Sequence, residues 1–203
     1  HEEKSDRESS AQPEESDDVD IIDQMEQENQ SLLDEDFFKD KTAEEENRNI
    51  SPVTNLFIQA AMEEMLDEAI KDSQQVTLSL VKINGLDRGN SISQNIIAIL
   101  KQNIPASELF EYKADSYAAV MKKTDLQNAV DIFEKIYNKM EDFLKDNNAV
   151  NEVSIGLSAV SGRNVKAERI ILEASQALDY ASQDPDSPIV AFRANPEKYQ
   201  EYV

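Results

Sequence analysis

The sequence predicts an α+β domain in which a central, mainly antiparallel sheet of five strands is flanked by helices. Two observations predict this class. From residue 51 onward, segments with apolar residues at spacings of three and four alternate with segments that carry them at every second position. In addition, two strand-like segments stand on either side of a short turn, as in a hairpin. Helices mixed with hairpins are typical of α+β folds.

The first predicted elements are a helix over 54–71 and a strand over 76–84. The helix carries apolar residues at helical spacing, and the strand carries them on both faces, as a central strand covered on both sides does. A short helix over 91–102 is expected to end before Pro105, because the residue before a proline disfavours helical backbone. The hairpin that follows has strands over 108–111 and 117–122 and a turn near Ala114 and Asp115.

The longest predicted helix follows the hairpin, and Thr124 with Gln127 predicts a capping box at its start. A strand over 153–157 is expected next. Ser154 and Gly156 alternate there with apolar residues, which predicts that one face of this strand is more polar. The remaining predicted elements are a helix over 167–181 and a strand over 188–192.

The composition excludes several classes of function. The chain has 203 residues and a net charge of −22, so it should repel nucleic acids and anionic membrane surfaces. It has no cysteine and a single histidine, His1, which excludes disulfides, thiolate metal sites and catalysis by an internal imidazole. No apolar run approaches the roughly 20 residues of a membrane span. We therefore expect a cytoplasmic protein without a metal site or cofactor.

The negative charge is concentrated at the N-terminus, where residues 1–50 contain 19 Asp or Glu and 5 Lys or Arg. We expect this arm to be a flexible linker. An apolar island over 19–38 predicts either a transient helix in that linker or a docking motif. Residues 51–194 are the predicted domain, and 195–203 a polar tail. Because the sequence starts with His1, we expect a fragment of a longer protein, with a membrane attachment or other domains outside it.

Several strings resemble, in order, the motifs of the GGDEF family, the diguanylate cyclase fold. SPVTNLF (51–57) resembles the D-x-L-T-G-L turn, and LSLVKINGL (78–86) resembles a first strand that ends in D-x-D-x-F. EYKADSY (111–117) resembles the signature R-x-G-G-D-E-F. The strongest matches are VSIGLSAVSGR (153–163), which resembles a strand with S-x-G-x-A, and EASQALDYA (173–181), which resembles the A-D-x-A-L-Y-x-A-K helix. The resemblance implies a nucleotidyl cyclase-like fold over nearly the whole predicted domain.

The signature loop, Lys113 to Tyr117, departs from the family pattern. Lys113 and Ala114 stand where the family has glycines that let the backbone approach the nucleotide. Ser116 replaces the glutamate, while Asp115 and the aromatic Tyr117 remain. The R-x-x-D product-inhibition motif falls on the uncharged string IPAS. The resemblance therefore implies a degenerate signature.

The metal site of the resembled enzymes also departs from the pattern. Cyclisation of GTP uses paired carboxylates that hold divalent cations, and Lys82 stands at one of the two Asp positions. Asp115 is then either the remaining ligand or a turn former. Lys82 either binds a nucleotide phosphate or pairs with Asp115 or Asp87. Asn90 is either a remnant of the guanine contacts or a helix cap.

Two functional hypotheses follow, together with a weaker third. The first is a non-catalytic regulatory module in signalling that binds another protein or another domain of its own chain, without catalytic residues. The alternative is a sensor that binds GTP or cyclic diguanylate without turnover, with Lys82, Asn90 and Asp115 as its candidate binding residues. An enzyme with an altered mechanism ranks last, because a second metal ligand is missing.

Overall fold

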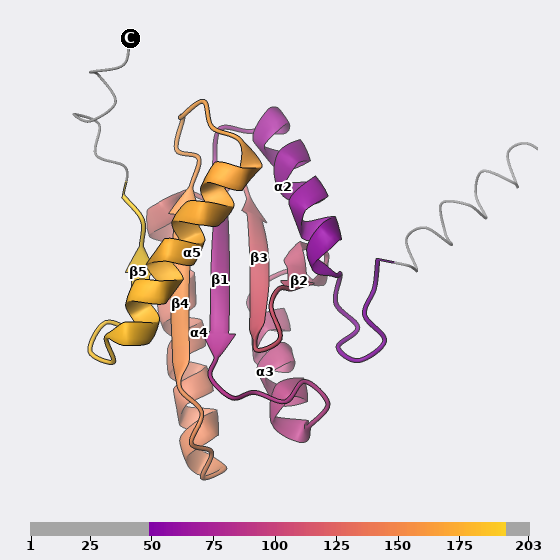
Figure 1. Cartoon of the computed structure of the whole chain (residues 1–203), viewed down its shortest axis with the longest axis vertical. Coiled ribbons are helices and arrows are strands. Elements are labelled where there is room, and N and C mark those ends of the chain that lie inside the picture. The colour runs from indigo at the N-terminus through magenta and orange to yellow at the C-terminus, as the bar shows by residue number, and fades with distance from the viewer. Residues whose placement is uncertain (1–48, 194–203) are drawn as a thin grey trace, which may run out of the picture. The chain divides into compact units, whose positions relative to one another are not determined.

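A computed structural model of the chain describes residues 49–193. The predicted helix at 19–38, the rest of the arm up to residue 48 and the tail over 195–203 lie outside the described residues. The elements follow the predicted order (Figure 1). They are α2 (Gln59–Asp72), β1 (Val76–Ile83), α3 (Ser91–Lys101), a 3-10 helix η1 (Ala106–Glu108), β2 (Leu109–Glu111), β3 (Ser116–Lys122), α4 (Leu126–Asp146), β4 (Val153–Ala159), α5 (Ala167–Gln183) and β5 (Ile189–Ala191).

The five strands form one sheet in the order β2-β3-β1-β4-β5. β1 runs antiparallel to β3 and β4, β2 runs antiparallel to β3, and β5 runs parallel to β4. This confirms the predicted mainly antiparallel five-stranded sheet. At the C-terminal end of β1, Lys82 stands opposite Ser116 on one side and Ser154 on the other. The end of β1, the hairpin turn and the start of β4 therefore lie at one end of the sheet.

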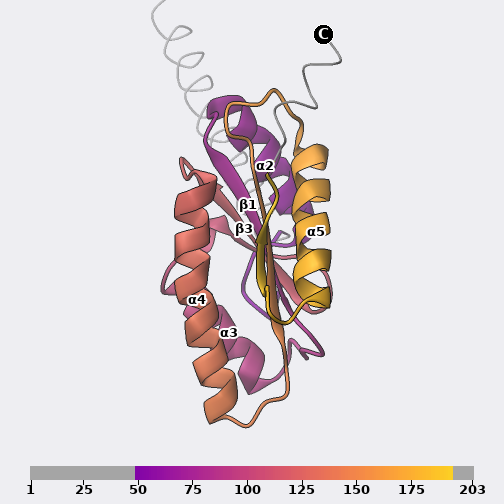
Figure 2. The ribbon, with the colours of Figure 1, turned by 90° about the vertical axis from the view of Figure 1, so that its left-hand side faces the viewer.

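Helices cover both faces of the sheet, with α2 and α5 on one side and α3 and α4 on the other (Figure 2). The side chains of β1 point alternately to the two sides. Leu78 and Leu80 belong to the core cluster under α2 and α5, and Val81 and Ile83 to the cluster under α3 and α4. The predicted central strand, covered on both sides, is confirmed. Within residues 49–193, no helix is both long and apolar enough to cross a membrane.

The start of α2 differs from the prediction, which placed it at Thr54 instead of Gln59. The preceding residues fold into a turn, in which the Ser51 N–H donates to the Leu56 carbonyl at 2.8 Å. Asn55 has φ 53°, in the left-handed region that Asn tolerates better than most residues. Leu56 is 2% exposed, so it contributes to the core from this turn and not from a helix.

The cap of α4 also differs from the prediction, because the N-cap is Asp125 and not Thr124. Asp125 Oδ1 accepts from the Asn128 N–H at 2.8 Å, whereas the Thr124 hydroxyl donates to the Lys122 carbonyl at 3.2 Å. Gln127 bonds to the side chain of Asp131 instead of closing a capping box. Asp and Thr are both good N-cap residues, and here Asp125, one residue after Thr124, caps the helix.

The more polar face of β4 that the alternation predicted is present, and it is buried. Ser154 is 8% and Ser158 0% exposed, because α5 lies directly on this face. A Cβ atom at Gly156 would lie only 2.3 Å from the Leu178 nitrogen and 2.4 Å from the Ala174 oxygen. Small residues are therefore required on this face by the backbone of α5, which leaves no room for larger ones.

Candidate functional site

The signature loop forms the closed turn of the β2–β3 hairpin. The Tyr112 N–H donates to the Ser116 carbonyl at 3.0 Å, and the Ser116 N–H donates to the Lys113 carbonyl at 3.0 Å. The hairpin tip is also tied to the central strand, because the Ile83 N–H donates to the Asp115 carbonyl at 2.9 Å. The sequence interpretation of Asp115 as a turn residue agrees with this geometry, and the loop lies beside the end of β1.

Lys82 and Asp115 meet at this end of the sheet, as one of the alternatives for Lys82 predicted. The Lys82 Nζ atom lies 3.9 Å from the Asp115 Oδ2 atom, and the two side chains are 35% and 29% exposed. Asp115 Oδ1 also accepts a hydrogen bond from the Ser116 hydroxyl at 3.0 Å. An ammonium group so close to the carboxylate repels a divalent cation. Within residues 49–193, no group of three His, Cys, Asp or Glu side chains could hold a metal ion.

Asn90 caps α3, which is the structural alternative that the sequence left open. Its side-chain oxygen accepts from the Ser93 N–H at 2.9 Å. In the same β1–α3 loop, the Gly89 N–H donates to Asp87 Oδ1 at 3.0 Å. These local bonds hold the loop in place. Among the described residues, the ion pair of Lys82 is with Asp115 and not with Asp87.

Arg88 is the central residue of this site, and the sequence interpretation missed it. Its guanidinium group donates to Glu111 Oε2 at 3.0 Å, to the Ser116 carbonyl at 3.0 Å and to the Lys113 carbonyl. It also lies over the Tyr117 ring, 5.8 Å from the ring centroid. Arg88 thus joins the β1–α3 loop to both strands of the hairpin. Its Nε atom is buried and has no hydrogen-bond partner among residues 49–193.

Glu111 extends this connection to the turn before α2. Its Oε1 atom accepts from the Thr54 hydroxyl at 2.6 Å, while Oε2 holds Arg88. The side chains of Arg88 and Glu111 are 20% and 13% exposed, so this ion pair is partly shielded from water. One carboxylate therefore holds two loops against the hairpin. A signal for this pair was available, since Glu111 occupies the position of the arginine in R-x-G-G-D-E-F and Arg88 supplies the opposite charge.

Tyr117, the aromatic residue of the signature, belongs to the core. Its side chain is 0% exposed, and its hydroxyl shares a hydrogen bond of 2.8 Å with the Ser93 hydroxyl. Burial raises the pKa of Tyr117, the Ser93 hydrogen bond and the Arg88 charge oppose this rise, and the Glu111 charge adds to it. The phenol therefore stays protonated near neutral pH and acts as a packing and hydrogen-bonding group.

Solved structures of other proteins share this architecture. The GGDEF domain of DgcB from Caulobacter crescentus, solved with c-di-GMP, gives a TM-score of 0.61 at 13% identity and covers 72% of this chain and 94% of that one. An active GGEEF domain of a diguanylate cyclase from Vibrio cholerae gives 0.56 at 14% identity, covering 67% and 97%. SiaD from Pseudomonas aeruginosa, a diguanylate cyclase solved with its activator SiaC, gives 0.58 at 17% identity, covering 85% and 81%.

These likenesses establish the fold, which is the GGDEF or nucleotidyl cyclase-like fold implied by the sequence motifs. No family model and no curated protein matches the sequence. At identities this low, the fold does not carry the chemistry of the similar proteins with it. The function must be argued from the residues of this chain.

Proposed function

We propose that the chain is a non-catalytic GGDEF-like module that acts in signalling or regulation through binding to a protein or to another domain. The observation that carries this proposal is the contact between Lys82 and Asp115, with 3.9 Å between Nζ and Oδ2. Where the resembled enzymes hold a divalent cation between carboxylates, this chain places an ammonium group beside the single carboxylate. The positive charge is therefore built into the protein and not supplied by a metal.

The substituted hairpin supports the same proposal. Lys113 and Ala114 place side chains where the resembled signature has glycines, and the Arg88 guanidinium group lies against the hairpin backbone at Lys113 and Ser116. Groups that would bind a nucleotide phosphate in an open site are engaged here in bonds within the chain. A nucleotide would have to displace them, which raises the cost of binding.

A similar structure supports a protein or interdomain partner. SiaD was solved in a complex with its activator, so a domain of this fold can take a protein partner. In this chain, the N-terminal 50 residues carry 19 acidic side chains, which favour an encounter with a basic surface. We place such a module in the cytoplasm, where cyclic diguanylate signalling takes place.

Two measurements test the proposal. Purified chain incubated with GTP and Mg²⁺ should form no cyclic diguanylate; formation of product that is lost on Asp115→Ala would show it to be an enzyme. A pull-down from the source cell, with the whole chain and with a chain lacking residues 1–50, should retain a partner. Loss of the partner with the shorter chain assigns binding to the arm, and retention assigns it to the domain.

A nucleotide sensor remains the second candidate, and the exposure of Lys82 favours it. The Lys82 side chain is 35% exposed and only loosely paired with Asp115, so a phosphate can compete with this carboxylate for the ammonium group. The DgcB domain was solved with c-di-GMP, so this fold can bind that nucleotide. Calorimetry with GTP and with cyclic diguanylate tests this candidate. A saturating heat that disappears on Lys82→Ala supports a sensor, and the absence of heat at micromolar sensitivity removes it.

A further inference from the structure

β5 forms one edge of the sheet, because β4 is the only strand that pairs with it in the described part of the chain (Figure 1). The Phe192 N–H donates to the Leu157 carbonyl at 2.7 Å, and the Pro188 carbonyl also accepts a bond from β4. Backbone groups bond to the same neighbour at every second residue, so those of Ile189 and Ala191 face away from β4. No described residue bonds to these outward N–H and carbonyl groups.

The side chains of this open edge are apolar. The run from Ile189 to Phe192 carries no charge, and each of its residues is only half-buried. Ile189 and Ala191 pack on the side of α3 and α4, whereas Val190 lies opposite Gly156 on the side of α5. Edge strands are commonly protected by charged side chains or by a covering segment. Unpaired backbone groups beside apolar side chains match an added strand, which brings the same two features.

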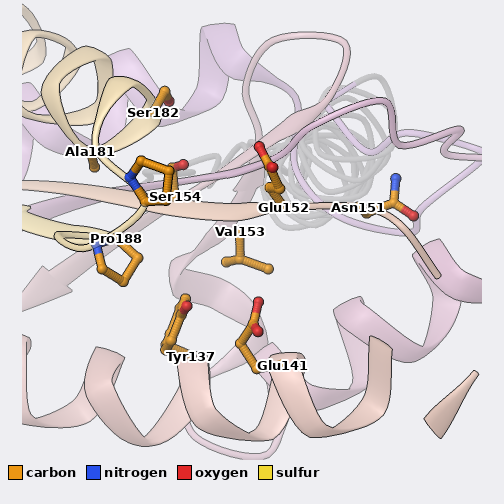
Figure 3. A pocket seen from close by; sticks show the side chains of 10 residues that line it. Tyr137, Glu141, Asn151, Glu152, Val153, Ser154, Ala181, Ser182 and Pro188 are labelled. Atoms are coloured by element: carbon orange, nitrogen blue, oxygen red, sulfur yellow. The ribbon is translucent and has the colours of Figure 1, made fainter. Parts of the chain in front are cut away.

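The helices on the two sides of the edge each add an aromatic side chain. On α5, Ser175 bonds to Tyr112 at 3.2 Å, so this flank of the helix faces the hairpin. Tyr180 lies five residues later, about 140° further round the helix, and therefore on the flank that faces β5. Its side chain is 69% exposed. On α4, Tyr137 points toward Pro188, the residue before β5 (Figure 3).

The flank of α4 that faces this edge is acidic. Glu141 lines a hollow together with Pro188, so its flank of the helix lies toward β5. Glu134 is exposed and lies seven residues, or about two turns, before Glu141 on the same flank. The opposite flank carries Lys139, whose ammonium group donates to Asn103 at 3.4 Å beside α3. The carboxylates of α4 are thus on the side of β5, and this lysine is on the other.

The chain segments around β5 add to the negative charge. Asp184 and Asp186 come shortly before β5, and Arg193 follows it. Lys145 pairs with Glu141 at 3.5 Å, but the Lys145 side chain is 71% exposed, so this pair is weak. A basic segment that approaches the edge is therefore attracted. A second copy of this chain, with a net charge of −22, is repelled.

We propose that β5 binds an extended, basic segment of a partner protein, which joins the sheet as a sixth strand. The backbone of this segment bonds to the outward groups of Ile189 and Ala191. Side chains alternate along a strand, so lysines or arginines on one face reach Glu134 while apolar residues on the other lie beside Tyr180. The inference rests on the proposed function, binding to a protein, and names the surface and the chemistry of the partner.

The test uses the amide NMR spectrum of the whole chain during titration with the acetylated peptide amide Lys-Val-Lys-Val-Lys-Val-Lys. We expect saturating shifts at 189–192 and slower hydrogen exchange of the Ile189 and Ala191 amides. The control peptide has the same sequence and charge, but its three central residues are N-methylated and cannot donate to a neighbouring strand. It should bind roughly tenfold more weakly, the size expected for loss of backbone hydrogen bonds.

Variants of the chain test the edge and its charge separately. Ala191→Pro removes an outward N–H and no bond to β4, and proline is tolerated at such positions, so we expect roughly tenfold weaker binding of the peptide. Glu134→Lys should weaken binding about threefold. Glu64→Lys makes the same change of charge on α2, which contacts β1, β2 and β3, and should leave binding nearly unchanged. If Ala191→Pro does not fold, the N-methylated peptide and Glu134→Lys still decide.

Several results would overturn this inference. Equal binding of the two peptides, equal weakening by Glu134→Lys and Glu64→Lys, or shifts confined to residues 1–48 would mean general attraction to an acidic chain. Slow exchange of the Ile189 and Ala191 amides before any peptide is added would mean that the edge is already covered. The cover is a second copy if sedimentation shows a dimer, and this chain itself if it shows a monomer. The proposed function fails separately, when the pull-down retains no partner.

Discussion

The two ends of the sheet are held by ion pairs of different kinds. At one end, Glu173 is 0% exposed and its carboxylate is bonded by Arg163 at 2.8 Å and by Arg169 at 2.7 Å. At the other end, Lys82 and Asp115 lie 3.9 Å apart with about a third of each side chain exposed. Deep burial makes the first group costly to disturb, whereas water screens the second. The comparison separates residues that hold the fold from residues that are free to define a function.

The comparison extends to the sequence motifs. Ser158, Arg163 and Glu173 lie in the two strings that most closely resemble the GGDEF family. The Ser158 hydroxyl of the first string donates to the Glu173 carboxylate of the second at 2.7 Å. The Lys82 pair lies in strings that differ most from it. The chain therefore keeps the family pattern where β4 and α5 are packed together. Under our proposal, the end that differs is the one where the catalytic function has been lost.

The largest expected effect is that of Glu173→Ala. This change leaves the Arg163 guanidinium group and the Ser158 hydroxyl without their buried acceptor, and breaking a buried pair in this way costs about 3–5 kcal/mol in free energy of unfolding. Urea denaturation followed by circular dichroism measures the loss. Glu168→Ala, an exposed change on the same helix, should alter stability by no more than about 0.5 kcal/mol. Equal losses for the two variants would contradict the role given to the Glu173 cluster.

Gly156→Ala should have the next largest effect. The new Cβ atom would meet backbone atoms of Leu178 and Ala174 at 2.3 and 2.4 Å, and a helix backbone cannot move aside as a side chain can. We expect a loss of about 3 kcal/mol, at the upper end for overpacking. Gly89→Ala is the matched control, because a Cβ atom there approaches no closer than 3.5 Å to a side-chain atom of Asp87. A mild effect of Gly156→Ala would mean that α5 lies farther from β4.

The order of elements and the composition of the sheet could be predicted from the sequence, because each element carries its own periodic pattern. The strand over 76–84 shows this well, since its two apolar faces required helices on both sides of the sheet. The start of α2 could not be predicted in the same way. Phe57 and Ile58 share the helical spacing of the residues that follow. They come directly after a turn that is held by the bond from the Ser51 N–H to the Leu56 carbonyl, and α2 begins only at Gln59.

The candidate site was only partly predictable, because its main contacts join segments that are distant in sequence. Lys82 lies at the end of one predicted strand and Asp115 in the turn directly before another, so their pairing could be predicted. The bonds from Thr54 and from Arg88 to Glu111 span 57 and 23 residues. No local pattern indicates such bonds, and the reversed charge at Glu111 was the one available clue.

Arg88→Ala tests the cluster that replaces the family pattern. Removal of the guanidinium group leaves Glu111 without its cation and the hairpin carbonyls without a donor. Because Arg88 is 20% exposed, water compensates in part, and we expect a loss of about 1–2 kcal/mol. Arg88→Lys keeps the charge but not the forked donors and should recover less than half of the loss. Amide hydrogen exchange should quicken at the hairpin and not in α5; faster exchange in α5 alone would refute this assignment.

The pH dependence of stability should depend on Glu173. Burial by itself would raise the pKa of Glu173, but the hydrogen bonds from Arg163, Ser158 and Arg169 outweigh burial and lower it. A folded-state pKa below the unfolded value of about 4.3 contributes stability above that pH, and this contribution is lost as the pH falls through the folded pKa. The gap in unfolding free energy between the unchanged chain and Glu173→Gln should therefore narrow below about pH 4.3. A gap that widens would reverse the sign assigned here.

The smallest effect on stability is expected for substitution of Lys82. This substitution tests most directly whether the Lys82 pair, unlike the Glu173 cluster, contributes little to the fold. Lys82→Ala should change the unfolding free energy by about 0.5 kcal/mol or less, because the pair with Asp115 is screened by water. Lys82→Asp places a second carboxylate beside Asp115, and two carboxylates together can bind a divalent cation. We expect Mn²⁺ to raise the melting temperature of Lys82→Asp but not that of the unchanged chain or of Lys101→Asp, which changes an exposed residue of α3. An equal rise in melting temperature in all three proteins would mean that the cation binds elsewhere on this acidic chain. The proposal that the Lys82 ammonium group replaces a metal would then be wrong.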